Sequence, residues 1–227
     1  MKIIFRYTLI IFIFFGIITL LKTKKDNIDT IEYTFYENSK QVTNLNKIDI
    51  LVNKDNYLPN DYVPDNLVEV TDNYDYTGKL LVKEAFDNYK EMKKDLENNN
   101  LKLRIISAFR SYQYQLELYG KYKEKDGEEL ADTYSARAGY SEHQTGLSID
   151  VDNTKVYYED FENTEEFKWM QENSYKYGYI LRYPKDKEDI TGYKYESWHY
   201  RYVGKKIAKY IHDNNICLEE YHKKRNH

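Results

Sequence analysis

Hydrophobic residues return every three to four positions in several stretches of the chain, which is the spacing of an amphipathic helix. The clearest stretch is residues 77–100, where Thr77 would act as the N-cap. Its apolar positions are Leu81, Ala85, Tyr89, Met92 and Leu96. The same spacing predicts further helices over residues 111–125, 164–178 and 204–215, the last being the closing helix.

Short apolar or alternating stretches lie between these helices and predict strands. They cover residues 101–107, 147–152, 179–183 and 198–203. In the second of these the alternation places Ser148, Asp150 and Asp152 on one face. Because strands and helices follow no regular βαβ rhythm, we expect an α+β fold, with a small mixed or antiparallel sheet and flanking helices.

An apolar run at residues 7–21 follows a basic start, and lysines follow it at once. The run is shorter than the ~20 residues that span a bilayer comfortably, so a cleaved signal peptide is one interpretation. No small-x-small cleavage pattern follows the run, which favours an uncleaved signal-anchor over residues 1–25. Basic residues lie on both sides of it, so the positive-inside rule leaves the orientation open.

The remaining chain divides into three parts. Residues 26–49 are polar and rich in Asn and Thr, which predicts a tether that lifts a domain off the membrane. Residues 50–220 carry the predicted helices and strands, and residues 221–227 form a C-terminal tail. We therefore expect one folded domain held at the membrane by a single span.

The composition suits a soluble globular body, with 32% charged and 41% hydrophobic residues among 227 and a net charge of −4. Lysine and arginine are interleaved with acidic residues, so no basic patch suggests a nucleic-acid partner. The protein is expected to be a monomer. The single cysteine, Cys217, excludes an internal disulfide and a Cys-rich zinc site. Tyrosine occurs 26 times, which reflects either AT-rich codon usage or a groove lined by amphipathic rings.

Two polar motifs, YSEHQTGLSIDVD and YESWHY, contain the residues with the strongest candidate chemistry. The first holds His143 and Asp150, and the second holds Glu196 and His199. Zinc hydrolases commonly hold the metal with three ligands drawn from His, Asp and Glu. A satisfied core histidine, or an aspartate that caps or pairs, is the alternative interpretation of each residue taken alone.

A single metal site requires the first motif to fold back on itself. His143 and Asp150 would lie up to ~23 Å apart in an extended chain, so a turn at Gly146 has to bring them together. Glu196 could then lie beside the metal as a base without being a ligand. The other histidines are expected to be solvated, in the closing helix and the tail: His212, His222 and His227.

The segment SEHQTGLSID resembles the S-x-H-x-x-G-x-[AS]-x-D motif of the D-Ala-D-Ala metallopeptidases, and YESWHYRYVG resembles their E-x-W-H motif. The wider group includes lysostaphin-type endopeptidases and the hedgehog zinc domain. SAFRSYQYQ, YSARAGYSEH and YGYILRYPKDKEDITGYKYE extend the similarity over about residues 51–203. It is closest to VanY-type carboxypeptidases and the related L,D-carboxypeptidases of Gram-positive cell walls, although Ala138 and Ser197 replace prolines that the family usually has.

The resemblance implies a hedgehog-like or D-Ala-D-Ala metallopeptidase-like fold with a Zn²⁺ cofactor. His143, Asp150 and His199 would be the zinc ligands, and Glu196 would be the general base that takes a proton from water and passes it to the leaving amine. Each of these roles depends on the motif rather than on the spacing alone.

The resemblance also implies a substrate site around Arg110, which matches the family arginine in a strand-to-helix loop. Arg110 would stabilise the developing oxyanion or hold the terminal carboxylate of the substrate, and a structural salt bridge is its alternative role. Gln115 and Ser141 match positions that line the substrate site in this family.

The resemblance implies a zinc carboxypeptidase that removes the C-terminal D-alanine from peptidoglycan stem peptides, and the apolar run at residues 7–21 leads us to expect that it is membrane-anchored. Its catalytic domain would lie outside the cell membrane of a Gram-positive-type envelope, where that substrate is found. L,D-carboxypeptidase action on tetrapeptide stems would use the same machinery. A non-catalytic wall-binding zinc domain is the alternative from another class of protein, and Glu196 argues against it because a structural site needs no base.

Overall fold

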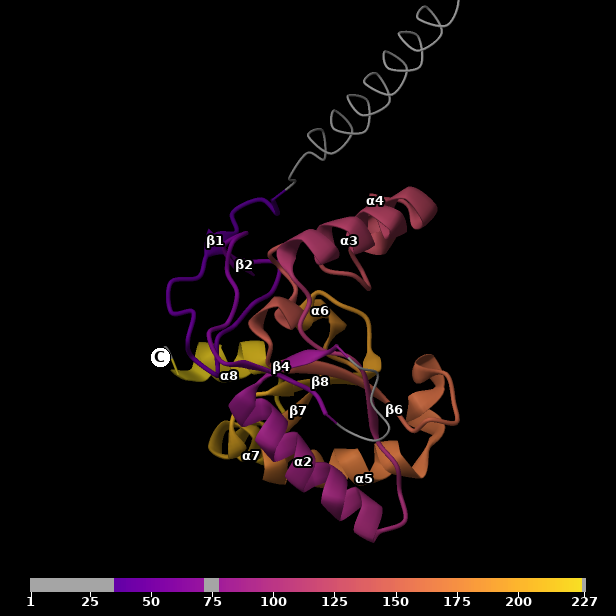
Figure 1. Ribbon diagram of the computed structural model, residues 1–227. Coiled ribbons are helices and arrows are strands. Elements are labelled where there is room, and N and C mark those ends of the chain that lie inside the picture. Colours follow the sequence, from indigo (N-terminus) through magenta and orange to yellow (C-terminus); the bar gives the residue numbers. More distant parts are fainter. Residues whose placement is uncertain (1–34, 72–77, 226–227) are drawn as a thin grey trace, which may run out of the picture. The chain divides into compact units, whose positions relative to one another are not determined.

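Four antiparallel strands form the central sheet, in the order β5-β6-β8-β7 (Figure 1). The strands are Arg104–Ser107 (β5), Ser148–Asp152 (β6), Tyr179–Tyr183 (β7) and Glu196–Tyr202 (β8). Each overlaps a stretch that predicted a strand, although β8 begins two residues before its stretch, and the expected α+β class is confirmed. The structure is a computed structural model that describes residues 35–71 and 78–225.

Two small strand pairs accompany the central sheet. The first pair is parallel and joins Lys40–Gln41 (β1) to Asn56–Tyr57 (β2). The second pair is antiparallel and joins Leu67–Glu69 (β3) to Leu80–Val82 (β4).

The helices follow the predicted order, with short additions. The α-helices are Lys83–Asn98 (α2), Tyr112–Asp126 (α3), Glu128–Ala131 (α4), Glu165–Asn173 (α5), Glu188–Thr191 (α6), Lys205–Asn214 (α7) and Leu218–Arg225 (α8). Three 3₁₀ turns are Glu142–Thr145 (η1), Tyr158–Asn163 (η2) and Ser174–Tyr177 (η3). Ser111, at the start of the predicted helix, caps α3, because its hydroxyl accepts a hydrogen bond from the backbone of Tyr114.

Strand alternation gives the two faces of the sheet different roles. On one face Ile105, Ile149 and Val151 are fully buried in the main hydrophobic core, into which α2 and α5 also pack (Figure 1). On the other face lie Asp150 and His199, which the register of β6 and β8 places directly opposite each other. The sheet therefore holds the core on one side and presents polar side chains on the other.

The first predicted helix begins later than its pattern indicated. Residues 80–82 form β4 instead, and α2 starts at Lys83. Leu81 is fully buried, as a residue on the inner face of the predicted helix would be. Its backbone is extended because it pairs with β3. Thr77, the predicted N-cap, lies outside the described residues.

Part of the predicted tether is folded onto the domain. The compact unit begins at Tyr36, whose hydroxyl donates a hydrogen bond to Asp132. The carbonyl groups of Ile48 and Ile50 accept hydrogen bonds from the buried guanidinium of Arg201. Residues 36–49 therefore pack against the rest of the domain, and the carbonyl group of Ile48 helps to satisfy a buried charge.

Helix α8 was not predicted, and it crosses the expected boundary at residue 220. Glu219 on this helix pairs with Arg182 of the central sheet. His222, which was expected to be solvated, is half-buried with Nε2 2.6 Å from the carbonyl oxygen of Asp49. His212 is exposed as predicted, and His227 lies outside the described residues.

No helix within residues 35–71 or 78–225 is long and apolar enough to span a bilayer. The predicted signal-anchor at residues 1–25 lies outside those ranges.

Candidate metal centre and active site

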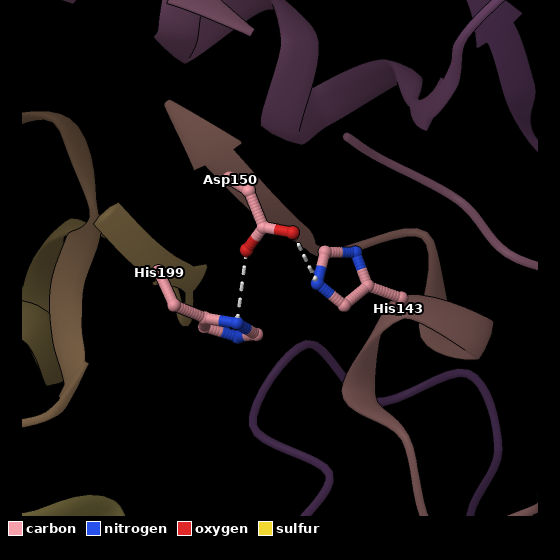
Figure 2. Close-up of side chains that lie close together, drawn as sticks. All are labelled: His143, Asp150 and His199. Carbon is pink, nitrogen blue, oxygen red and sulfur yellow. Dashed lines mark ion pairs between the residues drawn. The ribbon is translucent and has the colours of Figure 1, made fainter. Parts of the chain in front are cut away.

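The structure brings the three predicted metal ligands together. His143 comes from η1, Asp150 from β6 and His199 from β8, and one ligand atom of each lies within 4.8 Å of the others. His143 Nε2 is 3.2 Å from one carboxylate oxygen of Asp150, and His199 Nδ1 is 3.1 Å from the other (Figure 2). All three residues are buried.

Local backbone geometry explains this convergence. Cross-strand pairing sets His199 opposite Asp150. Gly146 ends η1 with a φ of 64°, in the left-handed region, and a Cβ at this position would lie 2.7 Å from the side chain of Leu67. The turn that the sequence required at Gly146 is therefore present, and a larger residue there would be strained by this φ and would have to move the side chain of Leu67.

The donor atoms of this cluster fit a zinc ion. His143 Nδ1 lies 2.6 Å from the carbonyl oxygen of Ala108, a bond that places the proton on Nδ1 and leaves Nε2 free to bind metal. Burial lowers the pKa of His143 to about 4, so its imidazole is neutral. His143 Nε2 is buried without a hydrogen-bond partner among the described residues. Two imidazoles and one carboxylate form a donor set typical of catalytic zinc sites.

His199 carries a proton where no metal is bound. Burial alone would lower its pKa, but Asp150 and Glu142 beside the ring raise the pKa of His199 to about 9. A cation that binds at Nδ1 takes the place of this proton, so metal binding and protonation compete at this ring.

Glu196 lies next to the three ligands without being one of them. Its carboxylate is buried, and Oε2 is 3.5 Å from His199 Nδ1. A register shift between β7 and β8 pairs Glu196 with Tyr183, and irregularities of this kind redirect side chains near active sites. Burial raises the pKa of Glu196 to about 7, a value that suits a group that accepts and returns a proton.

Arg110 faces the cluster from the loop between β5 and α3. Its Nη2 donates to Asp150 at 2.8 Å, its Nε donates to Ser107 at 3.0 Å, and its Nη1 donates to Gln115 at 3.0 Å. Its backbone N–H also donates to the carbonyl of His143. The guanidinium is thus fixed in one orientation beside the metal ligands.

Gln115 and Ser141 both line the same cavity as Arg110, and their role in a substrate site stays a prediction. Their hydrogen bonds also give them supporting roles. Gln115 holds Arg110 with its amide oxygen and donates from its amide nitrogen to the carbonyl of Ala136 at 2.7 Å. The hydroxyl oxygen of Ser141 accepts a bond from the backbone of His143, at the start of η1.

The cavity has a volume of about 430 Å³ and opens over the metal ligands. Aromatic rings form much of its wall, as in the second of the two interpretations of the high tyrosine content, which named no positions. The tyrosines concerned are Tyr122, Tyr134, Tyr158, Tyr183, Tyr193 and Tyr195. Other tyrosines, such as Tyr89 and Tyr179, are fully buried in the core, so the high tyrosine content serves both places.

Motif reasoning missed three charged residues: Glu142, which contacts the site, and Arg182 and Arg201, which contact Glu142. Glu142 lies 3.7 Å from His199, and its carboxylate accepts hydrogen bonds from Arg182 and Arg201. The available signal was an arginine inside each of two otherwise apolar strands, YILRYP and WHYRYVG. A buried arginine needs a carboxylate partner, but strand patterns do not identify that partner.

Comparison with known proteins assigns the chain to a family. The VanY family model, D-alanyl-D-alanine carboxypeptidase, matches residues 78–205. YodJ of Bacillus subtilis (strain 168) is 39% identical over 219 residues, which cover 89% of this chain and 80% of that protein. The LdcB LD-carboxypeptidase structure has a TM-score of 0.78 at 40% identity and covers 85% of this chain and 93% of its own. A vancomycin-resistance D,D-pentapeptidase VanY from a VanB-type cassette, solved with Zn(II), has a TM-score of 0.65 at 32% identity, over 76% of this chain and 97% of its own.

This chain belongs to the VanY family of D-alanyl-D-alanine carboxypeptidases. It is a metallocarboxypeptidase, and the resemblance seen in the two motifs is confirmed. The matched region contains all the predicted site residues, from Arg110 to His199.

Proposed function

We propose that this chain is a zinc-dependent carboxypeptidase that removes the C-terminal D-alanine from peptidoglycan stem peptides. The observation that carries the proposal is the buried His143, Asp150 and His199 set, which lines one cavity together with Glu196 and Arg110. Zinc is the cofactor that this donor set fits, and a VanY relative was solved with Zn(II). When bound, zinc would supply Lewis-acid activation of the scissile carbonyl and of water.

Residues of the chain would supply proton transfer, stabilisation of negative charge and binding of the peptide. Glu196 takes a proton from the attacking water and returns it to the leaving amine. Arg110 meets either the developing oxyanion or the terminal carboxylate of the substrate. Tyrosine side chains around the cavity provide apolar area together with polar tips, which suits a peptide that ends in small residues.

Two forms of the reaction fit this machinery, and both release D-alanine. The D,D form, predicted from the motifs, cleaves after a D-alanine in a pentapeptide stem. The L,D form cleaves after an L-configured residue in a tetrapeptide stem. The likeness to the LdcB LD-carboxypeptidase, with a TM-score of 0.78 against 0.65 for the D,D-pentapeptidase, favours the L,D form as a second candidate.

The test is to incubate the chain from about Asp26 onward with pentapeptide and tetrapeptide stems and to weigh the products. We expect the loss of one alanine from at least one stem, and the stem that reacts faster identifies the D,D or the L,D form. Cleavage inside a cross-link, or an unchanged mass for both stems with zinc present, would contradict the proposed reaction.

The metal can be tested separately. The purified domain is expected to contain one zinc ion per chain, and replacing both His143 and His199 by alanine should reduce the zinc content to background in elemental analysis. His212→Ala is a matched control, because His212 is exposed and lies on α7 away from the cluster. Undiminished zinc in the double variant would place the metal elsewhere.

We also propose that the full-length protein is held in the cell membrane by residues 1–25, with its catalytic domain outside. The apolar run in the sequence and the extracytoplasmic location of the substrate support this arrangement. Full-length protein should remain in the membrane fraction, and externally added protease should remove its domain. A released mature form that begins near Lys22 would instead indicate a cleaved signal peptide.

A further inference from the structure

Glu142 is a fully buried carboxylate in contact with the metal ligand His199. Its Oε2 lies 3.7 Å from His199 Nε2 and accepts a hydrogen bond from Ser148 at 3.3 Å. When Nδ1 of His199 binds metal, the ring proton lies on Nε2, which has no hydrogen-bond partner among the described residues. A buried N–H without a partner is costly, so a small approach of Glu142 Oε2 would satisfy it.

Two buried arginines hold the other oxygen of Glu142. Arg182 Nε donates to Oε1 at 2.7 Å, and Arg201 Nη1 donates to the same atom at 2.8 Å. Neither arginine side chain has any exposed surface. Because two directional bonds fix Oε1, the orientation of the carboxylate is set and Oε2 is left facing His199.

Helix α8 supplies the second negative charge that this cluster needs. Glu219 accepts two hydrogen bonds from Arg182, at 2.9 and 2.6 Å. Glu142 and Glu219 together balance Arg182 and Arg201, so the buried group carries no net charge. Without Glu219, the positive charge of the buried Arg182 would be balanced by Glu142 alone. Glu142 would then move toward Arg182.

We infer that Glu142 is a positioning residue that fixes the ring of His199, and that Glu219 acts on the metal centre through Arg182. The inference rests on the proposed zinc centre and deepens it. A carboxylate on the second nitrogen of a metal-bound histidine fixes the tautomer and makes the imidazole a stronger ligand. The C-terminal helix, which lines no part of the cavity, is then part of the metal site.

The test compares the parent protein with Glu142→Gln, Glu219→Gln and the matched control Glu220→Gln. Glutamine keeps the shape of each side chain and removes its charge. Glu220 is the next residue on α8. Its carboxylate pairs with the half-buried Lys187 and accepts a hydrogen bond from the backbone of Cys217, so it has a structural role on the same helix without contacting Arg182. Three quantities are measured: zinc affinity in competition with a chromophoric chelator, the absorption spectrum of the cobalt(II) form, and the melting temperature of the metal-free protein.

Zinc affinity is expected to fall roughly 10- to 100-fold in Glu142→Gln. In Glu219→Gln the fall in zinc affinity should be smaller, at least about 3-fold, because Glu219 contacts Glu142 only through Arg182. Both variants should show an altered cobalt(II) spectrum, since the ring of His199 is no longer fixed. Glu220→Gln should match the parent in affinity and spectrum.

A lower metal-free melting temperature with unchanged zinc affinity and cobalt spectrum in both variants would overturn the inference, because the cluster would then only stabilise the fold. If Glu142→Gln does not fold, Glu219→Gln decides alone: unchanged affinity in that variant refutes the link through Arg182, and reduced affinity supports it. A parent that binds no zinc would overturn the proposed zinc centre itself. If the parent binds zinc and cleaves stem peptides, and both variants bind zinc as tightly as the parent, only the inference about Glu142 and Glu219 is overturned.

Discussion

Replacement of Glu196 by glutamine is expected to lower the turnover of stem peptides by at least ~10²-fold while the fold and the bound zinc are kept. Glutamine has the same size but cannot accept the proton that leaves the attacking water. Glu196 lies outside the His143, Asp150 and His199 group, so the ligand set is unchanged. Burial, which raises the pKa of Glu196 to about 7, also means that no bulk water can easily take over its role.

The measurement is single-turnover cleavage of stem peptide by parent and variant, together with zinc content and binding of the uncleaved peptide. Binding should survive, because Arg110, Gln115 and Ser141 are untouched. Hydrolysis by Glu196→Gln at the rate of the parent would show that another group is the base. If neither protein hydrolyses any wall peptide while both bind it, a wall-binding role takes the place of the enzymatic one.

The metal ligands could be predicted because two kinds of information converge on them. Strand alternation placed Asp150 on the same face as Ser148, and the structure sets that face toward the site. The motifs then supplied His143 and His199, which spacing alone did not connect. Cross-strand register, which brings His199 opposite Asp150, is a property of the folded sheet and cannot be read from either motif separately.

The start of the first long helix shows why local pattern has limits. Leu81 and Ala85 are both fully buried, and their spacing of four fits one face of a helix. The chain instead switches from β4 to α2 at Lys83, because β3 offers a backbone partner to residues 80–82. Leu81 and Ala85 would be buried both in one continuous helix and in a strand followed by a helix. Only the presence of β3 as a pairing partner decides between these two structures.

The buried charges were missed for a related reason. Arg182 and Arg201 are each flanked by apolar or aromatic residues, which predicts burial but not the partner that makes burial possible. Their partners lie far away along the chain, in Glu142 and in Glu219 of the unpredicted helix α8. The folded position of residues 36–49 depends on the same group, since Ile48 binds Arg201. Hydrogen bonds from these two buried arginines therefore help to hold both ends of the domain.

Arg110 combines a fixed orientation with a place beside the reacting groups. Ser107 and Gln115 hold two of its donors, and the third contacts Asp150. Lysine could keep the charge at this position but not the planar fork that makes these three contacts. The arginine is therefore suited to meet an oxyanion or a carboxylate whose position is fixed by the metal centre.

Arg110→Ala is expected to lower kcat/KM for stem peptides by ~10²- to 10³-fold, the cost of removing one preorganised donor to developing negative charge. A loss of kcat at unchanged KM would assign Arg110 to the oxyanion, and a raised KM would assign it to the terminal carboxylate. In the second case the parent should cleave peptides with an amidated C-terminus poorly. Zinc content must be measured alongside, because Arg110 contacts the ligand Asp150.

Two further variants make the assignment of Arg110 specific. Arg110→Lys should recover only part of the rate, since it restores the charge without the fork. Gln115→Ala removes one support of the guanidinium but leaves it in place, so its effect should be several-fold smaller than that of Arg110→Ala. If Arg110→Ala with full zinc content stays within about twofold of the parent in both kcat and KM, Arg110 forms only a structural ion pair with Asp150, and another group meets the negative charge of the substrate.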